Sequence, residues 1–336
     1  MRALVFTAYG DPSVMSLTEV PAPVPAPGEV LIRVTAAGLN PVDALQREGT
    51  FKAIDPYRFP KVAGNELSGV IEALGAGVTG FEVGQSVIAR VGKSELGAIA
   101  QLATTSAAHV AAAPTSIPLA DAAGLPLAGL TAQQALGPDH LDVRAGERLL
   151  ITGAAGGVGQ IAVQLAVALG AEVTVTASPE GAEILRGLGA AHVIDYRERT
   201  VSEGPERFDK VLDLVGGDTV SDALHALEPG GALVTISGPP SPGSLTVIAA
   251  PSRRWVAAIV ERAASRRIRR TARALGVSYE FFLMHPDGAG LAALVREVDA
   301  GRLSVPIDSR FPLEEYRAAF ERLESRRSKG KVALQS

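Results

Sequence analysis

The sequence contains no cysteine among its 336 residues, which excludes disulfides, thiol nucleophiles and cysteine-ligated zinc sites. Aromatic residues are scarce, at 4%. There is no apolar run long enough to cross a membrane, and the first residues break too soon to form a signal peptide, so a cytoplasmic protein is expected. The formal net charge of −4 is modest, and whole-chain electrostatics therefore give no case for nucleic-acid binding.

The length and an apolar content of 47% are sufficient for two domains. Short β-prone segments separated by Pro- and Gly-rich turns make up the first third of the chain, whereas strands alternate with helices from about residue 121. This alternation is typical of a doubly wound parallel sheet. We expect a discontinuous β-rich domain at 1–122 and 278–336 and an inserted α/β nucleotide-binding domain at 123–277.

A glycine-rich turn at 153–159 joins a buried-strand pattern, Leu149–Thr152, to a helix pattern, Gln160–Leu169. Backbone N–H groups at a helix N-terminus face a phosphate in this arrangement, and glycine has no Cβ to block a pyrophosphate. The strand, turn and helix together predict a dinucleotide site. The residues expected to contact the cofactor there are Ala155, Gly156, Gly157 and Val158.

The second strand of this domain ends at Ala177, the place where NAD-specific folds carry an acid that bonds the ribose 2′-hydroxyl. Ser178 follows instead, and Glu180 lies at the expected first turn of the next helix. NADP(H) is therefore favoured, with Ser178 donating to the 2′-phosphate. The candidates for positive charge beside that phosphate are Arg197 with the neighbouring Tyr196, Arg326 and Lys329. An ordinary solvated surface explains each of these charges equally well.

Several motifs along the chain are specific in combination: 27–30, 38–43, 75–81, 127–132, 154–159 and 330–332. On these motifs the chain resembles the medium-chain dehydrogenase/reductase superfamily, and within it the zinc-independent quinone oxidoreductase (zeta-crystallin-like) branch. The resemblance covers essentially the whole chain. It implies an α/β protein with a GroES-like β-rich catalytic domain and a Rossmann domain that binds NADP(H). It also implies a homodimer.

Zinc alcohol dehydrogenases carry Cys where this chain has Asn40 and His where it has Asn65. Amides are poor zinc ligands, so no metal is expected, and alcohol oxidation is disfavoured without a Lewis acid. The resemblance then implies NADPH-dependent reduction of a quinone or of the C=C bond of an α,β-unsaturated carbonyl. Two alternatives remain open: a tailoring enzyme for a carrier-bound or polyketide-like substrate, and a non-catalytic NADPH-binding crystallin-like or sensor protein.

The resemblance also places Asn40 and Asp43 in the cleft near the nicotinamide, with Thr131 at the cofactor. Asn40 equally fits the N-cap of a helix with proline at its first position. A tyrosine that follows the aspartate in the quinone reductases is Leu45 here, so Tyr57 is the candidate substitute, with water as the alternative source of the proton. Later cofactor contacts are expected at Val215, Gly216, Ser237 and Phe282, with core packing as the alternative for Phe282.

Eight arginines but one acid, Glu261, lie between Arg253 and Arg273. Apolar residues recur there at helical spacing, so the segment is an amphipathic helix. Three interpretations remain: a solvated helix that covers the substrate cleft, a docking site for an acidic carrier protein or a CoA phosphate, and a contact with an anionic membrane surface.

Overall fold

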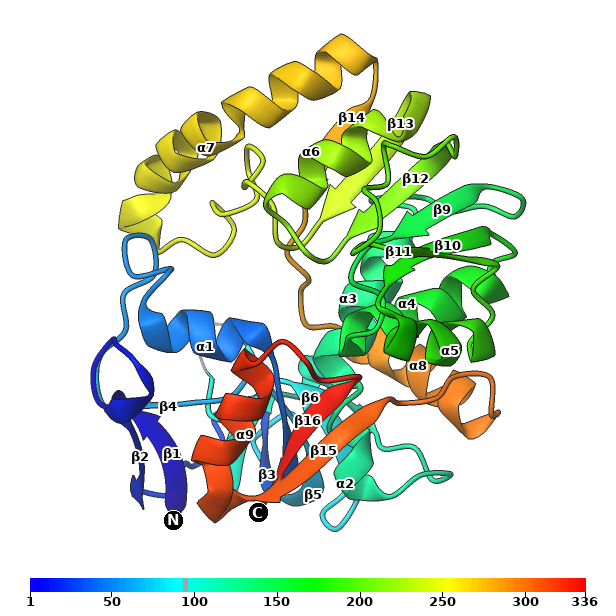
Figure 1. Ribbon diagram of the computed structural model, residues 1–336. Helices are drawn as coiled ribbons and strands as arrows, with labels where there is room; N and C mark the ends of the chain where they lie inside the picture. Colours follow the sequence, from blue (N-terminus) through cyan, green and yellow to red (C-terminus); the bar gives the residue numbers. More distant parts are fainter. Residues whose placement is uncertain (93–95) are drawn as a thin grey trace. The chain divides into compact units, whose positions relative to one another are not determined.

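The computed structural model describes residues 1–92 and 96–336, which divide into two compact units (Figure 1). The first unit comprises Met1–Leu130 and His285–Ser336, and the second comprises Thr131–Met284. Both boundaries lie further along the chain than the expected 122/123 and 277/278. One reason is that β14 (Ser278–Phe281) pairs in parallel with β13 (Leu227–Thr235) and so extends the sheet of the second unit.

The first unit is built on two mostly antiparallel sheets. The larger has the strand order β15-β16-β3-β5-β6-β8, with β7 also paired to β3, and the smaller has the order β2-β1-β4. The strands are β1 (Arg2–Phe6), β2 (Met15–Glu19), β3 (Glu29–Leu39), β4 (Lys61–Val62), β5 (Glu66–Leu74), β6 (Ser86–Arg90), β7 (Leu102–Ser106), β8 (Val110–Ala112), β15 (Ile307–Pro312) and β16 (Lys331–Gln335). The bent β-rich unit predicted from the sequence is therefore present.

Short helices connect these strands. Helix α1 (Pro41–Glu48) has Asn40 as its N-cap and ends at Gly49, whose φ of 82° is readily adopted only by glycine. The other helices that involve this unit are α2 (Leu119–Ala122), α3 (Pro126–Leu136), which crosses the unit boundary, α8 (Gly288–Asp299) and α9 (Tyr316–Glu324).

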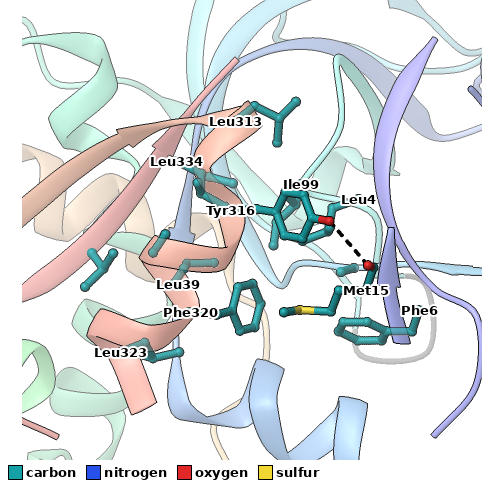
Figure 2. Close-up of a cluster of buried hydrophobic side chains, with 14 residues drawn as sticks. Leu4, Phe6, Met15, Leu39, Ile99, Leu313, Tyr316, Phe320, Leu323 and Leu334 are labelled. Atoms are coloured by element: carbon teal, nitrogen blue, oxygen red, sulfur yellow. Dashed lines mark hydrogen bonds between the residues drawn. The ribbon is translucent and has the colours of Figure 1, made fainter. Parts of the chain in front are cut away.

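The two ends of the chain share one hydrophobic core, which explains why the first unit is discontinuous (Figure 2). Tyr316 and Phe320 of α9 pack against Phe6 and Met15 near the N-terminus. The Tyr316 hydroxyl also donates to the Met15 carbonyl at 3.3 Å. Leu39 at the end of β3 completes this contact, so the last helix is anchored on the first strands.

The second unit contains a six-stranded parallel sheet in the order β11-β10-β9-β12-β13-β14, which confirms the predicted doubly wound fold. The order reverses between β9 and β12, and ligands bind such sheets at the carboxyl ends of the strands beside this switch point. The strands before β13 are β9 (Arg148–Ile151), β10 (Glu172–Ala177), β11 (His192–Asp195) and β12 (Phe208–Asp213).

The helices of the second unit are α4 (Gly157–Ala168), α5 (Pro179–Gly187), α6 (Asp218–His225) and α7 (Arg254–Leu275). Helix α4 begins at Gly157 rather than at the expected Gln160, so two glycines of the motif lie in its first turn. Gly170 follows its end with a φ of 84°. In the described ranges, none of the helices is long and apolar enough to cross a membrane.

Candidate functional site

The turn between β9 and α4 forms a cradle of backbone at the switch point. Gly156 is the N-cap of α4 and contributes no side-chain cap, so the N–H groups of the first turn are left to an external partner. A Cβ on Gly159 would lie 2.5 Å from Ala154 Cα, so only glycine lets the helix approach the turn this closely. The predicted contacts Ala155, Gly157 and Val158 lie in the same turn, and this geometry fits a pyrophosphate.

A second close approach lies at the ends of β12 and β13. Gly216 has a φ of 81°, and a Cβ there would lie 2.1 Å from the Ser237 carbonyl oxygen. The neighbouring Val215 is 52% exposed. The structure therefore brings Val215, Gly216 and Ser237 together at the carboxyl edge of the sheet, and their contact with the cofactor stays a prediction.

Asp213 connects three of these strand ends and was not among the predicted residues. It is completely buried and accepts hydrogen bonds from the Thr152 hydroxyl at 2.7 Å, the Thr235 hydroxyl at 2.7 Å and the Gly216 N–H at 3.0 Å. The signal in the sequence was an acid at the end of a strand, directly after the apolar Val211 and Leu212. Asp213 thus fixes the loops around the cofactor cradle.

Strands β10 and β11 are parallel, and Ala177 pairs with Asp195. Ser178, which follows β10, and Arg197, which follows β11, therefore lie at the same carboxyl edge of the sheet. Ser178 is the buried N-cap of α5. The Arg197 guanidinium lies 3.3 Å from the Asp195 carboxylate and 3.9 Å from that of Glu180. Tyr196, which directly precedes Arg197 in the sequence, is exposed. A phosphate at this edge has to compete with two carboxylates for Arg197.

Four other residues predicted to contact the cofactor lie outside the glycine turn and the strand ends described above. Thr131 is buried in α3, and the Phe282 ring packs 4.2 Å from the His140 ring, centroid to centroid. Packing within the second unit therefore accounts for the Phe282 side chain. Arg326 and Lys329 follow α9 in the first unit. The contact of these four residues with a cofactor stays a prediction.

Asn40 and Asp43 belong to a buried polar network at the start of α1. The Asp43 carboxylate accepts from the Asn40 N–H at 2.8 Å and from Asn65 Nδ2 at 2.6 Å. Asn65 Nδ2 also donates to Gln46 Oε1 at 2.7 Å. Asn40 is thus the N-cap through its backbone, while its side chain turns away from the helix to another partner. Both candidate residues are buried below the surface.

The Asn40 side chain contacts a buried ion pair between Lys331 and Glu66, which was not among the predictions from the sequence. Lys331 Nζ lies 2.6 Å from Glu66 Oε1, and Asn40 Nδ2 donates to the same oxygen at 2.7 Å. The other Glu66 oxygen accepts from the Leu127 N–H at 2.6 Å. Lys331 additionally donates to Asn40 Oδ1 and to the Leu39 carbonyl. Three segments distant in sequence are joined by this one carboxylate.

This donor set does not fit a catalytic zinc. Asn40 and Asn65 supply amide groups where thiolate or imidazole is required, and the ammonium of Lys331 is hydrogen-bonded to Asn40 Oδ1. A fixed positive charge at this point repels a divalent cation. Across residues 1–92 and 96–336, no group of three His, Asp or Glu side chains could hold a metal ion.

Burial raises the pKa of Asp43 from 3.8 to about 6, against the opposing hydrogen bonds from Asn65 and Asn40 and the charge of Lys331. The folded protein therefore holds this proton more tightly than the unfolded chain between about pH 4 and pH 6. The contribution of Asp43 to stability should fall by about 3 kcal/mol as the pH rises through that window and stay constant above it. Urea unfolding of wild type and Asp43→Asn over a pH series measures this difference.

Asp11→Asn is the matched control, since hydrogen bonds from Ser13 lower the pKa of this exposed carboxyl. The contribution of Asp11 to stability should change in the opposite direction, rising slightly with pH near pH 4 and then staying constant, because the folded carboxyl ionises at a lower pH than the unfolded one. A pH-independent offset in Asp43→Asn, equal at both ends of the window, would contradict the assignment.

Tyr57 is half-buried on the segment after α1. Its N–H donates to the Tyr9 hydroxyl at 2.6 Å, and the two rings lie 6.0 Å apart. Burial, with the nearby charges of Asp55 and Asp43, raises the pKa of Tyr57. The phenol is therefore neutral at physiological pH and available as a hydrogen-bond donor. Its role as a proton donor stays a prediction.

Comparison with known proteins adds a second line of evidence. Residues 26–143 match the family described as "Alcohol dehydrogenase GroES-like domain", and residues 188–334 match "Zinc-binding dehydrogenase". The chain is 32% identical to "NAD(P)H oxidoreductase RTN4IP1, mitochondrial" of Danio rerio, over 99% of this chain and 91% of that protein. It is 31% identical to "NADPH-dependent alkenal/one oxidoreductase, chloroplastic" of Arabidopsis thaliana, over 99% and 79%. The solved quinone oxidoreductase from Coxiella burnetii superimposes with a TM-score of 0.86 at 29% identity, covering 100% and 99%.

Proposed function

The chain belongs to the medium-chain dehydrogenase/reductase superfamily, among its quinone oxidoreductases and alkenal reductases, and from this premise we propose a specific reaction. The protein uses NADPH to reduce a small quinone or the C=C bond of an α,β-unsaturated carbonyl. Its dehydrogenase fold binds NAD(P), and the relatives named above support this acceptor class. Their names lend no support to a carrier-bound substrate or a non-catalytic role.

The observation that carries the proposal is the pairing of Lys331 and Glu66 beside Asn40. A zinc alcohol dehydrogenase uses its metal to polarise an alcohol or carbonyl oxygen. Here the equivalent positions hold the amides of Asn40, which accepts from the buried Lys331 ammonium, and of Asn65, which donates to Asp43 and Gln46, and these fit no such metal. An acceptor that is already electrophilic, such as a quinone or an enone, needs no such metal.

The residues of the chain bind the cofactor, assist the proton transfer and position the helix α1. When bound, the dihydronicotinamide supplies the hydride. The glycines at 156, 157 and 216 allow the backbone to approach the cofactor, and Asp213 holds the loops that carry them. On the substrate side, the β-carbon of an enone gains the hydride and the α-carbon gains a proton, which water or the Tyr57 phenol supplies. Asp43 acts as a positioning residue for α1.

NADPH specificity is the finer part of the proposal, supported by the absence of an acid at the tip of β10. Ser178→Asp introduces the carboxylate that NAD-specific folds carry, which repels a 2′-phosphate and accepts a hydrogen bond from the ribose hydroxyl. Aspartate is also a good N-cap, so α5 should be retained. We expect the NADPH-over-NADH preference in kcat/KM to fall at least tenfold, on the order of 1.4 kcal/mol.

Ser178→Asn provides the control for this change, because asparagine has the same shape as aspartate and caps helices equally well. It should keep the preference of the wild type. A loss of preference in both variants would mean that shape at residue 178, and not charge, discriminates the cofactors.

The reaction itself is tested by following NADPH absorbance with a panel of quinones, enones and saturated ketones or alcohols. We expect consumption with quinones or enones and none with the saturated compounds. Tight NADPH binding without consumption by any acceptor would refute the enzymatic proposal. Consumption with saturated ketones alone would refute the acceptor class.

Two broader expectations belong to the same proposal. A homodimer formed through an edge of the nucleotide-binding sheet is expected from the family, and the mass from light scattering measures it. The cytoplasmic location stays a prediction, since the two relatives named above are mitochondrial and chloroplastic.

A further inference from the structure

Helix α7 has one face that is fixed to the second unit. Its buried side chains recur every three or four residues and are Ala257, Glu261, Ser265, Ile268 and Ala272. Ile268 and Ala272 join the core cluster that also contains residues of α6. The opposite face of the helix is therefore directed away from the core.

The only acid of the helix does not neutralise that outward face. Glu261 is 1% exposed, and its carboxylate accepts the N–H groups of Gly243 at 2.8 Å, Leu245 at 2.5 Å and Thr246 at 2.9 Å. This carboxylate is thus fully used in holding the segment before the helix. The same segment presents Val247, which is 74% exposed.

The outward face carries apolar side chains toward its N-terminal end and arginines toward its C-terminal end. Trp255 is 67% exposed, Ile259 58% and Val260 41%. Exposed arginines follow at Arg262, Arg266, Arg267, Arg270 and Arg273. The ion pairs recorded for the described part of the chain involve none of these five arginines. Over 22 residues the helix is about 33 Å long.

We propose that this face of α7, from Trp255 to Arg273, binds the surface of an anionic lipid bilayer. Trp255 and Ile259 enter the boundary between headgroups and acyl chains, and the arginines contact lipid phosphates. A bilayer offers an apolar layer and a continuous layer of negative charge together. An acidic protein surface satisfies the arginines but leaves the exposed tryptophan, isoleucine and valine unmatched. The proposal is independent of which acceptor the enzyme reduces.

Trp255 is the only tryptophan of the chain, so its fluorescence reports directly on the proposed surface. The protein is mixed with vesicles of phosphatidylcholine alone, or of equal parts phosphatidylcholine and phosphatidylglycerol, at physiological ionic strength. We expect a blue shift, protection from iodide quenching and co-sedimentation with the anionic vesicles only. Binding should weaken as salt is raised, because salt screens the arginine–phosphate attraction.

The triple variant Arg266→Glu/Arg267→Glu/Arg270→Glu should weaken vesicle binding at least tenfold. The control Arg33→Glu/Arg144→Glu/Arg302→Glu makes the same change in net charge at exposed positions outside α7 and should bind nearly as wild type. Both variants are checked for NADPH binding to establish that they are folded.

Three results would overturn the proposal. The first is no binding of wild type to anionic vesicles at physiological salt. The second is equal loss of binding in the α7 variant and the control, which would make the attraction a property of net charge. The third is a Trp255 blue shift with soluble polyglutamate but not with vesicles, which would identify an acidic protein as the partner.

Discussion

Lys331→Met should lower the free energy of unfolding by about 3–5 kcal/mol, because it leaves the Glu66 carboxylate buried without its cation. Glu66 is completely buried, and its remaining partners are the Asn40 amide and the Leu127 N–H. Neither supplies a full positive charge. Urea denaturation at fixed pH, with circular dichroism as the signal, measures the loss.

Two comparisons separate this effect from lost packing. The double variant Glu66→Gln/Lys331→Met removes both charges and should recover much of the stability, since a buried pair replaced as a whole costs little. Arg2→Met breaks an ion pair to Glu314 in which both side chains are about half exposed, and should cost less than about 1 kcal/mol. If Lys331→Met costs no more than Arg2→Met, the Lys331–Glu66 pair does not support the site as described.

The second large effect is expected at Gly216. Gly216→Ala places a Cβ 2.1 Å from the Ser237 carbonyl oxygen, at a backbone φ of 81° that alanine rarely adopts. The loops after β12 and β13 must then separate, and Asp213 loses its bond to the Gly216 N–H. NADPH affinity should fall at least tenfold, which is about 1.4 kcal/mol, as measured by titrating nicotinamide fluorescence.

Gly217→Ala is the matched control. Its φ of 60° also lies in the region that favours glycine, but a Cβ there meets nothing within 4 Å. The weakening at Gly217 should be clearly smaller than at Gly216. Equal weakening would show that backbone strain, and not the close approach of the two loops, governs the cradle.

Local sequence patterns were sufficient to predict the dinucleotide cradle and the fold. The glycine turn, the β-strand pattern before it and the helix after it are contiguous, so their relation is fixed by short-range geometry. The predicted α/β architecture was confirmed for the same reason, because alternating strands and helices leave few arrangements of a parallel sheet. The helix start at Gly157 and the unit boundaries differed from expectation, since both depend on packing.

Long-range polar partners were beyond the reach of the sequence. Lys331 and Glu66 lie far apart in the chain and meet only because β16 and β5 both pair with β3. Asp213 reaches Thr152 and Thr235 because their strands are neighbours in the sheet. A composition or spacing rule contains none of these pairings.

Reduction with deuterium-labelled NADPH shows which carbon of the acceptor receives the hydride. The protein is incubated with a simple enone and NADPH carrying deuterium at the transferred position, and the product is analysed by mass spectrometry and NMR. We expect a saturated ketone with one deuterium at the former β-carbon for each NADPH consumed. An allylic alcohol with deuterium on the carbonyl carbon, or a product without label, would contradict it.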